Sequence, residues 1–234
     1  MAGVRTGISG QVNNNIVTDG LVYYLDPAYK ISYSGTGTTI TDIEGNLNAT
    51  MNGTAFSSVN NGVLDFDGTD DDLDTPYNDV FNLCNITNFT INVFIKVEDF
   101  VGDYNAIMAQ WPQQSVNDAW ILCHNSGKLS WVWAPYSVNG YFIQNSSTLT
   151  QNVWTMVSIV KEGSTHTLYE DGVQVATGTN SGTKSSSYQM QMGRYAGTSL
   201  YLNAKIGPAQ IYHKALSVQD LKQNYQAQKE RFGL

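Results

Sequence analysis

The sequence predicts an all-β fold built from two packed antiparallel sheets. Three observations favour it: about a dozen short segments rich in apolar residues, abundant Gly, Asn, Ser and Thr in the polar stretches between them, and a charged content of only 14%. Strands prefer β-branched and aromatic residues, whereas the long charged side chains that favour helices are scarce. The 234 residues, 41% of them hydrophobic, are enough for one sizeable core.

The first third of the chain is predicted to combine an arm, strands and loops. Residues 1–18 are polar, rich in Gly and Asn and without apolar periodicity, so we expect an extended N-terminal arm followed by one domain over residues 19–234. Residues 20–27, GLVYYLDP, predict the first strand, which ends at its proline. Residues 33–48 contain SGTGTT and DIEGN and are expected to be loop with short strands.

The middle of the chain contains the clearest strand patterns. Residues 64–74, LDFDGTDDDLD, predict a strand that runs into an acidic turn. In residues 89–97, FTINVFIKV, apolar side chains occupy alternate positions, which predicts a strand buried on one face. Further strands are expected at residues 105–110, 119–124 and 128–134, between polar turns.

The last third is predicted to hold a hairpin, more strands and one helix. Residues 154–161 and 165–177 form the hairpin system, and Asp171-Gly172 in LYEDGVQVA predicts a two-residue type I′ turn. The strands expected after it are residues 188–193, 200–206 and 209–212. Ser217 with Asp220 three residues later resembles a capping box, which predicts a short helix from residue 218 to about residue 229.

Charge and cysteine content exclude several classes of function. The net charge is −8, and residues 194–234 carry six basic and two acidic residues, so the part before them carries −12. An acidic body of this kind argues against binding nucleic acid. No apolar stretch is long enough to insert into a membrane, and the N-terminal residues lack the apolar stretch of a signal peptide. We therefore expect synthesis in a cytoplasm and free thiols at Cys84 and Cys123.

The order of these segments carries a resemblance to a known family. The segments are GLVYYLDP, LDFDGTDDDLD, FTINVFIKV, NVWTMVSIV, LYEDGVQVA and AKIGPAQIYHKALSVQDLKQNY. Together they resemble the laminin-G-like jelly rolls of the concanavalin A-like lectin/glucanase superfamily, over residues 20 to about 225. The final block, in which a strand leads through IYHKALS into a helix, is its most specific part. The resemblance implies a two-sheet jelly-roll sandwich.

A second resemblance is to accessory structural proteins of tailed bacteriophages, which often carry this jelly roll. It rests on the strand at residues 21–26 and on the ending ERFGL. It implies a virion protein, made in the host cytoplasm, that serves as a capsid decoration protein or fibre component.

Catalysis is not expected. Glucanases of the superfamily use a strand with Glu-x-Asp-x-Glu, which places two carboxylates on either side of the glycosidic bond. None of the five glutamates of this chain stands in that spacing, and the three histidines do not suggest a catalytic triad with serine or cysteine. A degenerate glycosidase is the remote alternative.

The acidic turn raises the question of a metal. An EF-hand loop that began at Asp70 would need Gly at the position of Thr75 and Glu at the position of Phe81, so that interpretation fails. The family resemblance instead allows calcium at a sheet rim, with Asp67, Asp70 and Asp71 as candidate ligands. The alternative, which stays open, is that these aspartates only cap turns and face the solvent.

Aromatic residues between positions 111 and 141 are candidates for sugar binding, because aromatic rings stack on the apolar faces of sugars. The candidates are Trp111, Trp120, Trp131, Trp133, Tyr136 and Tyr141. The alternative is that these rings belong to the core.

These observations lead to one hypothesis and one alternative. The hypothesis is a non-enzymatic virion protein whose arm, residues 1–18, contacts a capsid or another virion protein, while its domain binds surface glycans. Self-association is a further expected contact, because an arm with so few apolar residues needs a partner to become ordered. The alternative is a stand-alone carbohydrate-binding lectin that depends on calcium.

Overall fold

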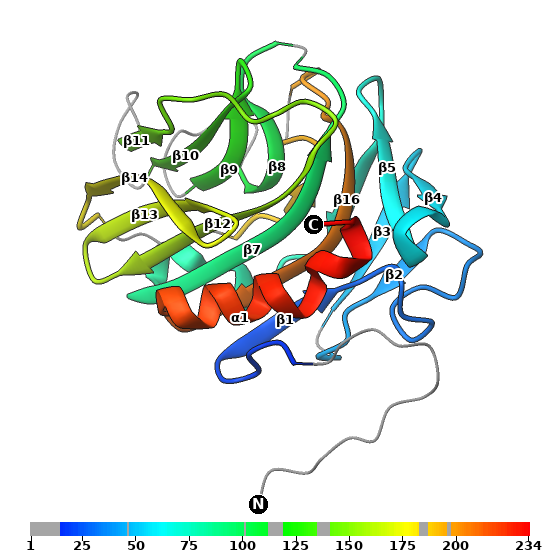
Figure 1. Cartoon of the computed structure of the whole chain (residues 1–234), viewed down its shortest axis with the longest axis horizontal. Coiled ribbons are helices and arrows are strands. Elements are labelled where there is room, and N and C mark those ends of the chain that lie inside the picture. Colours follow the sequence, from blue (N-terminus) through cyan, green and yellow to red (C-terminus); the bar gives the residue numbers. More distant parts are fainter. Residues whose placement is uncertain are drawn as a thin grey trace, which may run out of the picture.

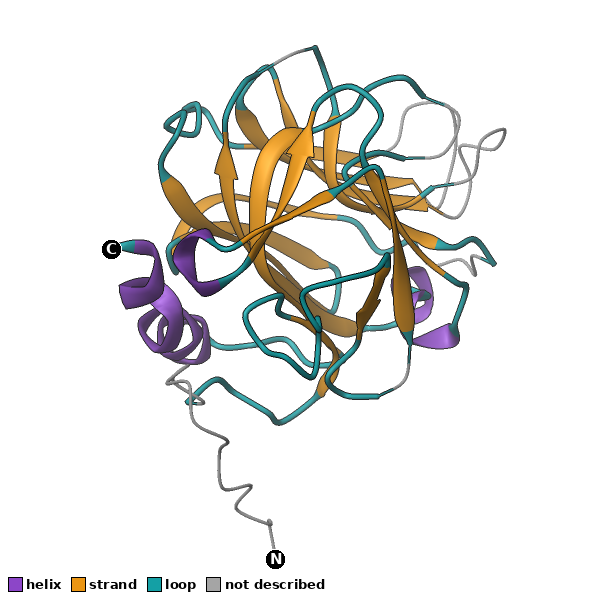
Figure 2. Ribbon diagram, turned by 90° about the vertical axis from the view of Figure 1, so that its right-hand side faces the viewer, coloured by secondary structure: helices purple, strands orange, loops and turns teal. Residues whose placement is uncertain are grey.

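The chain forms two antiparallel β-sheets that pack face to face, with a C-terminal helix against one of them (Figures 1 and 2). This computed structural model describes residues 15–45, 47–100, 102–111, 119–134, 141–182, 187–195 and 198–234. The all-β sandwich with a short C-terminal helix predicted from the sequence is confirmed. Among the described residues, no helix is long and apolar enough to cross a membrane.

Each sheet has eight strands in the described part of the chain. The first sheet, sheet A, runs in the order β14 (Val173–Thr179), β13 (Thr165–Glu170), β12 (Trp154–Glu162), β7 (Asn88–Val97), β16 (Asn203–Tyr212), β5 (Val63–Asp67) and β4 (Ala55–Ser57), and β1 (Leu21–Leu25) also pairs with β16. The second, sheet B, runs in the order β11 (Tyr141–Gln144), β10 (Lys128–Ala134), β9 (Ala119–Asn125), β8 (Asn105–Gln110), β15 (Met190–Met192), β6 (Asp72–Thr75), β3 (Asn48–Asn52) and β2 (Thr39–Thr41). The helices are α1 (Val218–Gln228) and the short 3-10 turns η1 (Val59–Asn61), η2 (Asp79–Phe81), η3 (Leu83–Asn85) and η4 (Lys229–Phe232).

Two local predictions are confirmed in detail. Asp171 and Gly172 connect β13 to β14 and both have positive φ angles, 51° and 77°, as a type I′ turn requires. At the start of α1, the Ser217 side chain accepts a hydrogen bond from the Asp220 backbone N–H, and the Asp220 carboxylate accepts one from the Ser217 N–H. This is the predicted capping box.

The prediction that residues 89–97 are buried on one face only is wrong. Strand β7 lies in the middle of sheet A. Eight of its ten residues are buried, one is partly buried and one is exposed. One face packs into the space between the sheets, and α1 with η4 covers the other (Figure 1). Phe94, on the covered face, stacks on Phe232 of η4 with ring centroids 4.9 Å apart.

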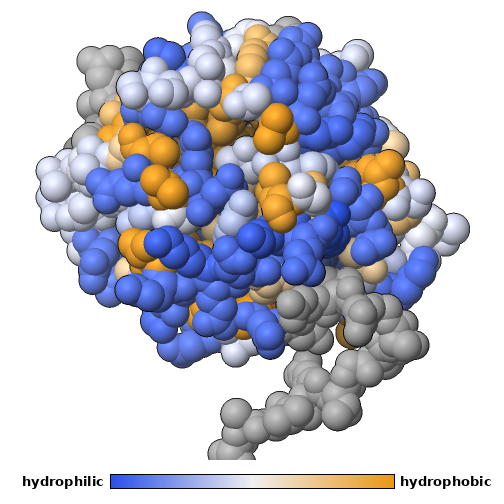
Figure 3. Space-filling model, in the orientation of Figure 1, coloured by the Kyte–Doolittle hydropathy of each residue, from blue (hydrophilic) through white to orange (hydrophobic). Residues whose placement is uncertain are grey.

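The core therefore has two layers. The larger lies between the sheets and contains most of the buried apolar residues. The smaller lies between sheet A and the C-terminal helices, where the Trp154 and Phe232 rings are 4.3 Å apart. Cys84 and Cys123 are both buried. The outer surface in Figure 3 is mostly hydrophilic, with scattered apolar groups.

A buried ion pair fastens the C-terminal helices to the body of the molecule. Arg231 Nη1 lies 2.7 Å from Asp26 Oδ1 and 2.9 Å from Oδ2, and the side chains are 6% and 0% exposed. The guanidinium also donates to the backbone carbonyls of Asn60 and Gly62. Burial raises the pKa of Asp26, and Arg231 offsets part of that shift. Each charge thus offsets the free-energy cost of burying the other.

Two histidines are fully buried and uncharged at neutral pH. Burial lowers the pKa of His124 to about 4. Burial, aided by the charge of Lys161, lowers that of His166 to about 4. Trp131 Nε1 donates to His166 Nδ1 at 3.0 Å, so the proton of the neutral ring sits on Nε2, which lies 3.2 Å from the Asn180 carbonyl oxygen.

We predict that Arg231→Ala lowers the free energy of unfolding by about 3–5 kcal/mol, because it leaves the Asp26 carboxylate buried without its partner. Urea unfolding measures the change. Glu230→Ala removes an exposed neighbouring charge and serves as the control, with an expected effect within about 0.5 kcal/mol. Equal effects of the two substitutions would contradict a structural role for the ion pair.

We also predict that the buried histidines destabilise the fold as the pH falls from 6.5 to 4. An unfolded histidine, with a pKa of 6.5, binds a proton in this range while the folded one, with a pKa of about 4, stays neutral, so protonation favours the unfolded state. Each histidine accounts for about 3 kcal/mol over the whole range. Carboxylates titrate in the same pH range and contribute equally in both proteins. The measurement therefore compares the unfolding free energy of wild type with that of His124→Leu at each pH. Parallel curves for the two proteins would contradict the prediction.

Candidate functional site

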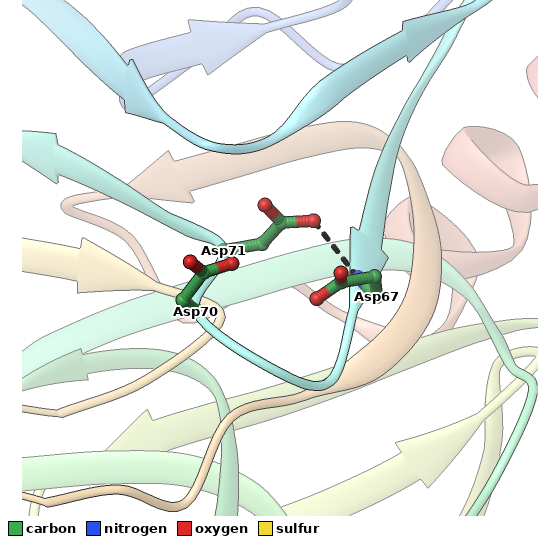
Figure 4. A group of neighbouring side chains, drawn as sticks. All are labelled: Asp67, Asp70 and Asp71. Carbon is green, nitrogen blue, oxygen red and sulfur yellow. Dashed lines mark hydrogen bonds between the residues drawn. The ribbon is translucent and has the colours of Figure 1, made fainter.

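Three aspartates gather where the chain crosses from one sheet to the other. Strand β5 of sheet A ends at Asp67, a turn follows, and β6 of sheet B begins at Asp72. One carboxylate oxygen from each of Asp67, Asp70 and Asp71 lies within 4.8 Å of the others (Figure 4). The structure thus brings together the three residues predicted as metal ligands.

Short-range hydrogen bonds give the turn its shape. The backbone N–H of Asp67 donates to Asp71 Oδ2 at 2.9 Å (Figure 4). The Thr69 N–H donates to Asp67 Oδ1 at 2.7 Å. Gly68 takes a φ of 80°, which a residue with a Cβ adopts only with strain. These contacts show that Asp67 and Asp71 shape the turn, which is the structural role given as the alternative to metal binding.

The three carboxylates raise the electrostatic free energy of the turn. Asp71 is only 6% exposed, and burial raises its pKa, with further contributions from Asp67, Asp70 and Asp65. Lys205, which lines the same cavity, pairs instead with Asp65 at 2.6 Å and with Glu98 at 3.3 Å. Among the described residues, no cationic side chain forms an ion pair with the three aspartates.

An open cavity of about 550 Å³ adjoins the aspartates. Its lining consists of Gly53, Ala55, Asp65, Asp67, Asp70, Asp71, Glu98, Asn203 and Lys205. Gly53 is required for this shape: a Cβ at that position would collide with Asp71 Oδ1. Five carboxylates and one ammonium group give the cavity a strongly negative potential.

The donor set of the aspartate cluster suits a hard cation. All the available ligand atoms are carboxylate oxygens, which calcium prefers, and no thiol or imidazole belongs to the cluster. The backbone of Gly53 lies close to Asp71 Oδ1, with which a Cβ at that position would collide. The cluster therefore fits a calcium ion by the chemistry of its donor atoms.

The prediction that Trp120, Trp131 and Trp133 bind sugars is wrong, because each has an exposed fraction of 0%. The three indoles point into the space between the sheets, where Trp131 lies 5.9 Å from the ring of Trp120 and 5.8 Å from that of Trp133. Each indole N–H has an internal acceptor: Phe81 O for Trp120, His166 Nδ1 for Trp131 and Gly182 O for Trp133. They are core residues.

The other predicted aromatic residues are distributed differently. Trp111 is half-buried on the outer face of sheet B, where its ring contacts that of Tyr195 at 6.0 Å. Tyr141 is the first residue of β11, and Tyr136 lies outside the described residues. Three further aromatic residues, Tyr104, Phe142 and Tyr195, contact this outer face or one another and were not predicted, although the alternation of β10 was a usable signal. If Trp131 and Trp133 point inward, then Val132 and its cross-strand partner Phe142 must point outward.

Comparisons with known proteins agree with the fold. A family model described as concanavalin A-like lectin/glucanases superfamily matches residues 67–222. A search of the curated proteins finds no match to the chain.

Three solved structures illustrate the similarity, all at low sequence identity. Trypanosoma rangeli sialidase in complex with 2,3-difluorosialic acid gives a TM-score of 0.70 at 12% identity, over 92% of this chain and 34% of the sialidase. The botulinum neurotoxin serotype D binding domain gives 0.67 at 16% identity, over 90% of this chain and 52% of that one. Domain 4 of an extracellular arabinanase from Geobacillus stearothermophilus, in complex with arabinotriose, gives a TM-score of 0.69 at 13% identity. The match covers 88% of this chain and 98% of the arabinanase domain.

The chain thus spans about a third of the length of the sialidase and about half of that of the neurotoxin domain, whereas it matches nearly the whole of the arabinanase domain. At these identities the similarity shows the fold alone.

We predict that Asp71→Asn stabilises the protein in metal-free buffer at neutral pH. The substitution removes a desolvated charge from among like charges, and the amide oxygen still accepts the hydrogen bond from the Asp67 N–H. A gain of about 1 kcal/mol corresponds to a rise in Tm of about 2–4 °C for a chain of this size. Asp19→Asn is the control, because Asp19 is exposed and is distant in sequence from the three aspartates; it should not raise Tm. A fall in Tm for Asp71→Asn would contradict the electrostatic interpretation.

Proposed function

This chain belongs to the concanavalin A-like lectin/glucanase superfamily, and on that premise we propose that it is a non-enzymatic virion protein of a tailed phage that binds glycans. It would be made in the host cytoplasm and serve as a capsid decoration protein or fibre component. The observation that carries the glycan-binding part is the group of three aspartates beside an open cavity at the rim of the sandwich.

In this proposal Asp67, Asp70 and Asp71 hold a calcium ion. The ion, when bound, supplies coordination positions for sugar hydroxyl oxygens, since calcium accepts six to eight oxygen ligands. Its positive charge also offsets the repulsion among the three carboxylates. Asn203 and Lys205 line the same cavity and provide hydrogen-bond donors to a saccharide.

Similar folds support binding of a ligand by such a domain. Domain 4 of the arabinanase was solved with arabinotriose, and the neurotoxin structure is a binding domain. A non-enzymatic role is supported by the sequence, in which no glutamate stands in the Glu-x-Asp-x-Glu spacing of the superfamily's glucanases. In the cavity, Lys205 forms ion pairs with Asp65 and Glu98.

The virion part of the proposal rests on the terminal segments. The last residues of the arm are hydrogen-bonded to α1. The backbone N–H of Val17 donates to Asn224 Oδ1 at 2.8 Å, and Gln223 Nε2 donates to the Asn15 carbonyl at 2.8 Å. Asn15 and Val17 thus lie against α1, and we expect the arm, residues 1–18, to contact a capsid or another virion protein.

The experiment combines particle composition with glycan binding. Mass spectrometry should detect the chain in purified particles, and those particles should bind a glycan array in calcium but not after EDTA. Particles produced with a chain that lacks residues 1–14 should contain no copy of it, although the truncated chain, which keeps the contacts of Val17 with α1, folds when purified alone. Asp71→Asn should be incorporated normally and should lose the glycan signal.

The outcomes separate the alternatives. Absence of the chain from particles, together with calcium-dependent binding by the free protein, would leave the stand-alone lectin and reject the virion role. Equal glycan binding in calcium and in EDTA would reject the cation site. Release of reducing sugar from a bound polysaccharide would reject the non-enzymatic role.

A further inference from the structure

Three polar side chains lie side by side on the face of sheet A that α1 covers. Ser158 of β12 and Gln210 of β16 are the cross-strand partners of Asn92, which lies between them on β7. Ser158 is 0% exposed, and Gln210 and Asn92 are each 2% exposed. We call these three residues the polar row.

The polar row faces the C-terminal helices and not sheet B. Side chains two positions apart on a strand share a face of the sheet. Phe94, Met156 and Tyr212 each lie two positions from a member of the polar row, and all three belong to the smaller core layer between sheet A and the helices. The polar row thus interrupts the apolar packing of that layer.

Several hydrogen-bonding atoms at this interface lack a protein partner. In the described part of the chain, no group donates to or accepts from Asn92 Oδ1, Asn92 Nδ2, Ser158 Oγ or Gln210 Nε2. Gln228 Nε2, on a buried residue of α1, is also unpartnered among the described residues. A polar atom that loses water on burial and gains no partner is costly. Five such atoms would cancel a large part of the stability of a typical domain.

The contacts of α1 place Gln228 on the side of the helix that meets the sheet. One turn earlier, Asn224 Nδ2 donates to the Tyr212 hydroxyl at 3.0 Å. That hydroxyl lies 3.3 Å from Gln210 Oε1, at the end of the polar row. Because residues four apart share a face of a helix, Gln228 lies on the same face as Asn224, and both are buried.

The same hydrogen bonds extend to the end of the arm. The Val17 N–H donates to Asn224 Oδ1 at 2.8 Å, and the Tyr212 hydroxyl donates to the Val17 carbonyl at 3.0 Å. One network therefore joins the arm, α1 and β16. It ends at Gln210, beside the unpartnered atoms of the polar row.

The kinds of unpartnered atoms identify the ligand that would satisfy them. Three are amide nitrogens, which donate hydrogen bonds, one is an amide oxygen, which accepts them, and the Ser158 hydroxyl does both. A cation would suit the oxygens but be repelled by the N–H groups, and an anion would do the reverse. Water both donates and accepts, and an internal water makes about three hydrogen bonds to buried groups of this kind.

We propose that the interface between α1 and sheet A is a binding site for about two ordered water molecules, which complete a network from Ser158 to Val17. The site shares no residue with the cavity beside Asp67, Asp70 and Asp71. It therefore does not depend on the function proposed above.

Oxygen-17 magnetic relaxation dispersion counts the long-lived internal waters of the full-length protein and tests the site. The double variant Asn92→Leu, Ser158→Ala removes three of the five unpartnered atoms, so we expect it to hold about two fewer such waters than wild type. Met156→Leu, on the same face of β12, exchanges apolar side chains of similar volume and is the matched control. Its count should equal that of wild type. An equal count for the double variant and wild type would overturn the proposal.

A second measurement uses wild type alone, so it does not depend on the folding of a variant. In nuclear Overhauser spectra, the side-chain amide protons of Asn92 and Gln210 should show direct cross-peaks to water. The laboratory-frame and rotating-frame peaks should have opposite signs, as they do for water bound longer than the tumbling time of the protein. The amide of Gln174, exposed on β14, should show only short-lived surface water. Lack of long-lived water at both Asn92 and Gln210 would overturn the proposal.

Discussion

The burial of sheet A on both faces is the constraint on which the rest of the structure depends. One face of β7, β12 and β16 packs against sheet B, and the other packs against α1 and η4 (Figure 1). Because the central strands of sheet A have no free face, ligand contacts are left to the rim between the sheets, the edge strands of sheet A and the outer face of sheet B. The acidic turn occupies the rim.

The fold could be predicted wherever its determinants are close together in the sequence. The type I′ turn at Asp171-Gly172 and the capping box of Ser217 and Asp220 each depend on residues within four positions of one another. The strands β4 and β11 were not predicted, because three or four residues cannot establish an alternating pattern. Two separate strands were expected where β16 is continuous, since the bulge between Ile206 and Ala209 interrupts the alternation without ending the strand.

The candidate site could be predicted only in part, for a related reason. Asp67, Asp70 and Asp71 are close in sequence, so their proximity followed from the turn. The cavity beside them also needs Gly53, Glu98 and Lys205, which strand pairing brings from distant segments. The tryptophans of β9 and β10 illustrate another limit of prediction from the sequence. Alternation shows that Trp131 and Trp133 share a face, but only the packing of the two sheets decides which face is inside.

The Asp26–Arg231 ion pair has a consequence for the order in which the molecule can be assembled during synthesis. Its partners are 205 residues apart, and β1 pairs with β16 over a similar distance. Contacts of such high sequence separation form late and slowly. Until Arg231 has left the ribosome, Phe94 and Trp154 lack the helices that cover them, and the nascent chain exposes an apolar surface on sheet A. A chaperone would protect that surface.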